Sequence, residues 1–367
     1  MMLIGLRDRL FIPKADLCVF NQSIEKIIMK VLVIGGTGFI GLQVVRQLIK
    51  MGHEVTVFHR GETKADLPQV KWIKGDRHNL SDYKSEFKNF APQVVLDMIP
   101  YTAKDARDVV DIFKDIAKRV VAISSQDVYR ARDILWQRET GIIDPTPLTE
   151  DSPLRSQLYP YRSLSNDPFA HDYDKIPVEQ VYLEAKDFPA TIIRLPMVYG
   201  AGDIWHRFYP YIKRMSDRRQ AIVLEQTVAE WQGCYGYVEN VARAIALAVD
   251  NHKARRIYNV CELPTSEADW LKAIAHVMGW QGKVIIIPKS QMPNTWELKE
   301  NLSQHWVTDS TRIRTELGYT EIIDRHEALK RTIAWEKEHP PNLVSIEGHA
   351  KLLDYKDEDI TLTKYYS

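Results

Sequence analysis

The chain has 367 residues, of which 45% are hydrophobic and 27% charged, and its 49 lysines and arginines are balanced by 49 aspartates and glutamates. A chain of this length buries a sizeable core, so it needs no disulfide or metal to hold its fold. The net charge of +0 gives no reason to expect a polyanion, and we expect no nucleic-acid partner. No stretch approaches the ~20 apolar residues of a membrane span, so we expect no membrane partner. Three scattered cysteines without a CxxC pair are typical of a cytoplasmic protein.

Residues 1–28 precede the first regular pattern. Arg7, Asp8 and Arg9 interrupt their apolar run, which excludes a signal peptide. The sequence MKVLVIGGTGFIG, which begins at Met29, is typical of a natural start. We interpret 1–28 as an extension from a misassigned start codon, and the alternative is a short arm that packs on the domain or on a neighbouring subunit.

Strand and helix patterns alternate after Met29. Apolar runs typical of strands lie at 31–34, 55–58, 70–73, 94–96, 120–123 and 191–195, and helical stripes lie at 39–51 and 109–116. This alternation predicts a parallel sheet with helices on both faces, an α/β Rossmann-type doubly wound fold. A helix at 238–249 and a strand at 257–260 are expected to return to the same sheet.

The rest of the chain predicts a smaller mixed C-terminal lobe that binds the substrate. We assign 29–200 with 237–262 to the sheet domain, 201–236 with 263–340 to the lobe, and 341–367 to a polar, peripheral tail. Within the lobe, a helix is expected to end at Leu317, because Gly318 can adopt the left-handed cap conformation.

A glycine-rich turn follows the first strand and opens an amphipathic helix. Its sequence matches GxxGxxG through Gly35, Gly38 and Gly41, and GxGxxG through Gly36, Gly38 and Gly41. Glycines permit a tight turn and close approach to a pyrophosphate, which then faces the positive end of the helix. We predict that NAD(P) is bound here, and the alternative is a turn without a ligand. The predicted loop comprises Gly35, Gly36, Thr37, Gly38, Phe39, Ile40 and Gly41.

The end of the second strand bears on the choice between NADP and NAD. An acidic residue there would bind the ribose 2′-hydroxyl, whereas an arginine suits a 2′-phosphate. This chain has His59 and Arg60, and no acid before Glu62. We therefore favour NADP, with Arg60 as the phosphate ligand. The alternative is NAD bound without that carboxylate, in which case Arg60 is a solvated surface residue.

Several segments together resemble the extended short-chain dehydrogenase/reductase superfamily, in its NAD-dependent epimerase/dehydratase branch. They are GGTGFIG at 35–41, Gly75-Asp76, SSQDVY at 124–129, RLPMVYG at 194–200, YVENVARAI at 237–245 and TRIRTELGY at 311–319. The resemblance covers 29–339, and the order and spacing of the motifs make it specific. It implies that Asp76 contacts adenine and that Met98 to Tyr101 lie along the nicotinamide ribose, with Arg77 and Pro196 as further cofactor contacts.

The resemblance also implies a catalytic Ser, Tyr and Lys, in which the lysine lowers the pKa of the tyrosine that serves as acid and base. Ser125 matches the serine, although a serine at a strand end can also be a loop cap. Lys175 matches the lysine because Glu179 follows it at the family's spacing. The tyrosine position, four residues before Lys175, is occupied by His171, whereas Tyr173 lies two residues before it. Three hypotheses stay open: Tyr173 is the acid/base, His171 replaces it, or neither residue is catalytic.

The two residues after Ser125 distinguish dehydratases from the other enzymes of the branch. Dehydratases of the branch carry two acids there, whereas this chain has Gln126 and Asp127. We therefore retain Asp127 as a catalytic candidate but do not expect a dehydratase. The alternative for Asp127 is a loop cap.

Aromatic and basic residues gather after Gly200, at 205–211, and recur near Trp231. Aromatic faces and an arginine fork suit a sugar ring and its phosphate, so we predict substrate contacts at Tyr199, Arg207 and Trp231. The alternative is that these rings form the core of the lobe. The eleven histidines show no metal-ligand spacing, and no metal is expected.

The sequence thus predicts an NAD(P)-dependent oxidoreductase or epimerase that acts on a secondary alcohol, favouring a sugar nucleotide. Two alternatives stay open: a non-catalytic NAD(P)-binding sensor or scaffold, and an RNA-binding member of the superfamily, which the balanced charge disfavours. The expected partners are the small-molecule substrate and, at most, a second copy of the chain in a homodimer.

Overall fold

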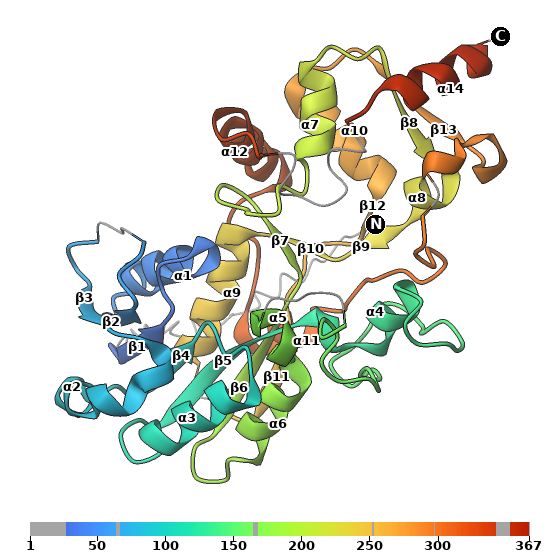
Figure 1. Cartoon of the computed structure of the whole chain (residues 1–367). Helices are drawn as coiled ribbons and strands as arrows, with labels where there is room; N and C mark the ends of the chain where they lie inside the picture. The colour runs from blue at the N-terminus through green and yellow to red at the C-terminus, as the bar shows by residue number, and fades with distance from the viewer. Residues whose placement is uncertain are drawn as a thin grey trace, which may run out of the picture.

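The centre of the computed structural model is a seven-stranded parallel sheet in the order β11-β6-β5-β4-β1-β2-β3 (Figure 1). The structure describes residues 27–63, 67–163, 168–251, 253–296, 298–342 and 353–366, so most of the predicted N-terminal extension lies outside the described residues. The predicted doubly wound Rossmann-type fold is confirmed. The strands are β1 (Lys30–Ile34), β2 (Glu54–His59), β3 (Lys71–Lys74), β4 (Val94–Asp97), β5 (Arg119–Ser125), β6 (Ala190–Leu195) and β11 (Arg256–Asn259).

Helices cover both faces of this sheet (Figure 1). Val31 and Val33 of β1 pack in the core with α1 and α9, whereas Leu32 and Ile34 pack in the core with α3 and α6. Because both faces of β1 are covered, the strand is an uninterrupted apolar run. The helices of this half are α1 (Phe39–Lys50), α2 (Lys84–Phe90), α3 (Ala103–Phe113), α4 (Arg130–Leu135), α5 (Pro168–Asp172), α6 (Lys175–Glu184) and α9 (Val238–Asp250).

A second lobe lies beyond the carboxyl ends of the strands (Figure 1). Its core is aromatic, since Tyr199, Phe208, Tyr235 and Trp270 pack with ring centroids 5.1–5.5 Å apart. Gly318 ends a helix in the left-handed conformation, as predicted. The helices here are α7 (Tyr209–Ser216), α8 (Gln226–Glu230), α10 (Glu267–Met278), α12 (Arg325–Glu338) and α14 (Lys356–Tyr366). Three strand pairs accompany them: β7 (Met197–Tyr199) with β10 (Tyr235–Tyr237), β9 (Gln232–Gly233) with β12 (Thr265–Ser266), and β8 (Ala221–Glu225) with β13 (Lys283–Ile287). Helix α11 (Thr311–Leu317) packs instead against β11 and α9 of the sheet half (Figure 1).

Helix α14 belongs to the segment expected to be a peripheral tail, and it packs against β8. Its Glu358 is 0% exposed and accepts a hydrogen bond from the backbone N–H of Val223 at 3.0 Å. Arg219 pairs with the same carboxylate at 3.1 Å. This helix therefore contributes a buried charge to the lobe. Over the described part of the chain, no helix is long and apolar enough to cross a membrane.

Candidate functional site

The glycine loop between β1 and α1 forms an open backbone cradle. Gly35 has a φ of +86°, a left-handed conformation that favours glycine. A Cβ on Gly41 would lie 2.6 Å from the carbonyl oxygen of Gly35, so only glycine permits this approach of helix to strand. A Cβ on Gly38, at the N-terminus of α1, would meet nothing within 4 Å. This free space, next to unpaired helix N–H groups, fits a pyrophosphate.

A cavity of about 640 Å³ opens from this loop, at the carboxyl ends of β1 to β4. The strand order reverses between β1 and β4, which is where doubly wound sheets bind their ligands. Seven of the residues predicted to bind the cofactor line it: Gly35, Thr37, Gly38, His59, Arg60, Asp76 and Arg77. Phe39, Ile40 and Gly41 form the first turn of α1, Met98 is buried beyond β4, and Pro196 lies between β6 and β7. The cavity therefore fits the adenosine half of a dinucleotide.

Basic groups gather at the end of β2. The side chain of Arg60 is 65% exposed and pairs with Glu62 at 2.9 Å. Burial lowers the pKa of His59, and the neighbouring Lys74 lowers it further. Because the pair with Glu62 is exposed, the Arg60 guanidinium can turn towards a ligand in the cavity at small cost.

Arg77 and Asp76 line the cavity, and each also makes contacts that hold the surrounding backbone in place. Arg77 is 6% exposed and pairs with Asp97 at 3.0 Å and with Asp105 at 3.2 Å. The Asp76 carboxylate accepts a hydrogen bond from the backbone N–H of His78 at 3.0 Å. The Arg77 guanidinium thus ties β4 to the start of α3.

The carboxyl end of β5 carries the predicted Ser125, and α6 supplies Lys175 beside it. Ser125 Oγ accepts a hydrogen bond from the backbone N–H of Asp127 at 3.2 Å. Lys175 is 4% exposed and its Nζ donates to the carbonyl oxygens of Pro100 at 2.7 Å and Ile123 at 3.1 Å. Burial lowers the pKa of Lys175 to about 8. The structure therefore brings the serine, the aspartate and the lysine together at one strand end.

His171 and Tyr173 do not share a helix with Lys175. Helix α5 ends at Asp172 and α6 begins at Lys175, with the Asp174 carboxylate accepting from the backbone N–H of Ile176 at 2.9 Å. His171 is 55% exposed in its side chain, and its Nδ1 lies 3.3 Å from the Asp172 carboxylate. The interruption means that helical spacing does not decide which of the two residues enters the site.

Tyr173 enters the site. Its hydroxyl donates to Oδ2 of Asp127 at 3.3 Å, and Lys175 Nζ lies 5.7 Å from the centre of its ring. Burial and the Asp127 carboxylate raise the pKa of Tyr173 well above its ordinary value. This corrects the expectation that the phenol pKa is lowered here, because desolvation and a nearby carboxylate both favour the protonated form. Tyr101 joins the two parts of the site, since it lines the cofactor cavity and its ring lies 6.0 Å from that of Tyr173.

Sequence reasoning missed Tyr161, whose hydroxyl lies 3.5 Å from the same Asp127 oxygen. Tyr161 belongs to the long connection between α4 and α5, where neither periodicity nor motif spacing marks a residue. Only the folded connection brings this side chain to the end of β5.

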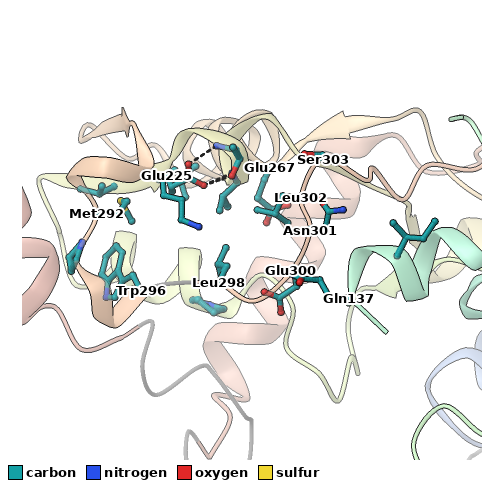
Figure 2. Close-up of a pocket in the computed structure, with 18 of the residues that line it drawn as sticks. Gln137, Glu225, Glu267, Met292, Trp296, Leu298, Glu300, Asn301, Leu302 and Ser303 are labelled. Atoms are coloured by element: carbon teal, nitrogen blue, oxygen red, sulfur yellow. Dashed lines mark hydrogen bonds between the residues drawn. The ribbon is translucent and has the colours of Figure 1, made fainter. Parts of the chain in front are cut away.

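A larger cavity, of about 980 Å³, lies in the second lobe (Figure 2). Apolar side chains of Met292, Trp296 and Leu298 line one side, and Glu225 and Glu267 line another (Figure 2). Burial raises the pKa of Glu267, and Tyr211 donates a hydrogen bond to its carboxylate at 2.9 Å. This combination of apolar walls and hydrogen-bond acceptors fits a ligand with a planar or apolar part and N–H or O–H donors.

The three predicted substrate residues lie in different environments. Arg207 lines the larger cavity and pairs with Asp203 at 2.6 Å. Trp231 donates through Nε1 to the carbonyl oxygen of Gln304 at 3.0 Å, and Tyr199 is 0% exposed within the aromatic core. In the described portion of the chain, no group of three or more His, Cys, Asp or Glu side chains is arranged to hold a metal ion.

The fold and the cradle define a dinucleotide-binding protein of the Rossmann class. Residues 31–261 match the model of the NAD dependent epimerase/dehydratase family, and the chain belongs to this family. The resemblance found in the sequence is thereby confirmed.

The similar proteins include both a stem-loop binding protein and a sugar-nucleotide epimerase. The chain is 34% identical over 265 residues to the chloroplast stem-loop binding protein of 41 kDa b from Arabidopsis thaliana, covering 68% of this chain and 61% of that protein. It is 26% identical over 358 residues to a UDP-glucose 4-epimerase of Lactobacillus helveticus, covering 85% of this chain and 98% of that enzyme. The structure of the Bordetella bronchiseptica enzyme WbmG in complex with NAD and UDP aligns with a TM-score of 0.60 at 15% identity, over 85% of this chain and 96% of the other.

Proposed function

We propose that this protein is an NADP-dependent oxidoreductase or epimerase that acts on a secondary alcohol of a sugar nucleotide. One observation carries the proposal. Tyr101 connects the cofactor cavity to a cluster in which Ser125, Tyr173 and Lys175 lie at the end of β5. An open glycine cradle at one end and proton-carrying side chains at the other are what transfer of a hydride and a proton requires.

The roles of the individual residues follow from their chemistry. When bound, the nicotinamide cofactor supplies or accepts the hydride. Lys175 would hold the ribose, Ser125 would orient the substrate oxygen, and Tyr173 would carry the proton. Because the pKa of Tyr173 is raised, its phenol keeps its proton at neutral pH and is suited to donate it to a carbonyl oxygen.

The larger cavity would take the part of the substrate that does not react. Trp296 and Leu298 offer an apolar wall for a nucleobase (Figure 2). Among the described residues, nothing hydrogen-bonds Oε2 of Glu267, which can accept from an N–H or O–H donor of the ligand, whereas the Glu225 carboxylate caps α8. The relationship to a UDP-glucose 4-epimerase supports a sugar nucleotide as the substrate class.

The Tyr173→Phe and His171→Ala variants test the assignment of the acid/base. With a panel of UDP- and dTDP-sugars and NADP(H), we expect Tyr173→Phe to lower turnover by about 10²–10⁴-fold and to leave NADPH affinity unchanged. His171→Ala should retain turnover, because its ring is paired with Asp172 at the surface. If instead His171→Ala is the inactive variant, the roles are reversed. If the wild-type protein binds the cofactor but turns over none of the sugars, a non-catalytic sensor or scaffold is the better description.

The relationship to a chloroplast stem-loop binding protein favours a second candidate, an RNA-binding protein. The net charge of +0 opposes it, because nucleic-acid affinity depends on neutralising phosphates. Fluorescence anisotropy with a labelled RNA stem-loop, measured at 50 and 200 mM salt, tests this candidate. Affinity that falls steeply between the two concentrations would support RNA binding, and absence of binding at 50 mM would exclude it for that RNA.

A further inference from the structure

The Asp127 carboxylate is bound on one side only. Two phenols, those of Tyr161 and Tyr173, donate to Oδ2 at 3.5 and 3.3 Å. Among the described residues, nothing hydrogen-bonds Oδ1, although Asp127 is only 6% exposed. A buried acceptor without a donor costs free energy, so the free oxygen calls for a functional explanation.

The connection that carries Tyr161 is anchored to the start of α6. Arg155 donates to the Asp174 carboxylate at 2.7 Å and to the backbone carbonyl of Asp127 at 2.7 Å. The backbone N–H of Tyr159 donates to the other oxygen of Asp174 at 2.6 Å. Since Arg155 and Asp174 are both buried, this anchor holds the connection firmly.

The surroundings of Tyr161 hold its ring in place. Its centroid lies 5.5 Å from that of Tyr173, and the Arg132 guanidinium lies 5.1 Å from the ring centre. A carboxylate held by one donor can rotate about its terminal bond. Two donors that reach the same oxygen from different segments restrict that rotation, and the other oxygen then keeps one direction.

We propose that Tyr161 is a positioning residue of this site: together with Tyr173 it fixes Oδ2 of Asp127, and so directs Oδ1 to accept a hydrogen bond from a substrate hydroxyl. A carboxylate oxygen in this place selects an O–H donor and repels a phosphate. The ligand class is therefore a polyol or sugar with a hydroxyl next to the reacting carbon. The role towards a substrate rests on the proposed function, whereas the shared carboxylate is a property of the protein alone.

NMR of protein labelled with [¹³Cζ]tyrosine tests the shared carboxylate without any substrate. The Tyr161→Phe and Tyr173→Phe variants assign two of the 17 tyrosine resonances. Burial raises the pKa of both phenols and Asp127 raises it further, so Asp127→Asn should lower the titration midpoints of both. Tyr161→Phe should also displace the Tyr173 resonance at neutral pH. Tyr159→Phe is the matched control, because the Tyr159 ring lies on Arg162, and it should displace neither resonance.

Two results would overturn the proposal. One is a Tyr161 resonance that keeps its midpoint in Asp127→Asn, and the other is a Tyr173 resonance that does not move in Tyr161→Phe. If Asp127→Asn fails to fold, the second measurement decides alone, since Tyr161→Phe removes a single oxygen.

A kinetic experiment tests the role towards the substrate. With a sugar nucleotide that the wild-type enzyme turns over, Tyr161→Phe should lower kcat about tenfold and leave NADPH affinity unchanged, and Tyr159→Phe should leave both unchanged. An unchanged kcat and pH profile in Tyr161→Phe would overturn the positioning role. If the wild-type enzyme turns over no sugar nucleotide, it is the proposed function that fails, and the NMR result still decides whether the two phenols share Asp127.

Discussion

The cofactor cavity and the cavity of the second lobe are built from different parts of the chain. The cofactor cavity is formed by the carboxyl ends of neighbouring strands, and its central element is the backbone from Gly35 to Gly41. The cavity of the second lobe is formed by α7, β8, α8, the start of α10, residues 289–296 and 298–303, and residues 134–141 at the end of α4 and after it. A backbone cradle depends on a few glycines that are close in sequence, whereas a side-chain cavity depends on how distant segments pack.

Charges are also used differently in the two cavities. Arg60, at the cofactor cavity, is paired with the exposed Glu62 and can exchange it for a ligand. In the second lobe, Arg207 is paired with the buried Asp203, and Arg214 lies 4.0 Å from the buried Glu358. Arg207 and Arg214 therefore stabilise the fold of the lobe, as the buried Arg77 does beside the cofactor cavity, whereas the exposed Arg60 is available for binding. Four experiments can break or sharpen this comparison.

The largest effect is expected for Glu358→Ala, in the second lobe. Removing this carboxylate weakens the pairing of the buried Arg214, takes one of two carboxylates from Arg219 and removes the acceptor of the Val223 N–H. Together these losses should cost about 3–5 kcal/mol of the free energy of unfolding. NADPH affinity should not change if the lobe is stabilised separately from the cofactor cavity. Denaturant unfolding and NADPH fluorescence titration measure the two quantities. The control is Asp359→Ala, since Asp359 is 59% exposed, and it should cost much less. A parallel loss of NADPH affinity in Glu358→Ala would show that the two regions are coupled.

Gly41→Ala and Gly38→Ala distinguish the contribution of the glycine cradle to stability from its contribution to NADPH binding. The Cβ on Gly41 would clash with the Gly35 carbonyl at 2.6 Å, so the first variant should lose about 1–3 kcal/mol of stability and also bind NADPH poorly. The Cβ on Gly38 would point into free space, so the second variant should keep its melting temperature and lose affinity. Thermal denaturation and NADPH titration of both variants test this. Unchanged NADPH affinity in Gly38→Ala would mean that the pyrophosphate does not lie over this residue.

Arg60→Ala tests the preference for NADP. The loss of a charge-assisted contact with the 2′-phosphate should weaken NADPH binding by roughly 1.5–3 kcal/mol and leave NADH binding unchanged. The matched control is Glu62→Ala, which frees Arg60 from its surface partner and should not weaken NADPH binding. Equal affinities for NADPH and NADH in the wild-type protein would refute the NADP assignment before any variant is made.

The smallest effect is expected for Lys175, whose titration should make NADPH affinity depend on pH. Its pKa is lowered to about 8, so the ammonium is present at pH 7 and is lost as the pH rises through 8. Losing the charge should weaken NADPH binding between pH 7 and pH 9 by roughly 1 kcal/mol, the difference between a charged and a neutral hydrogen bond. Lys175→Gln should bind more weakly at pH 7 and should lack this step. A step that persists in Lys175→Gln would have to be assigned to another group.

The proton-carrying cluster shows where sequence reasoning ends. Lys175 and Ser125 follow motifs of fixed spacing, and both lie at the end of β5 as the motifs imply. The choice between His171 and Tyr173 stayed open in the sequence because it depends on whether the helix begins before or after them. The Asp174 carboxylate decides this, since it caps α6 while it binds Arg155 and the backbone of Tyr159 from a distant connection.

The sequence by itself determined the doubly wound sheet, the cofactor cradle and the family. Strand periodicity and glycine spacing are local properties, and a parallel sheet that is covered on both faces leaves few other arrangements for them. Only the tertiary structure decided that Tyr161 reaches Asp127, that Glu358 is buried under β8, and that the pKa of Tyr173 is raised. Each of these depends on contacts between segments far apart in the chain and on the loss of water around charged groups. The local spacing of residues in the sequence reveals neither the contacts nor the desolvation.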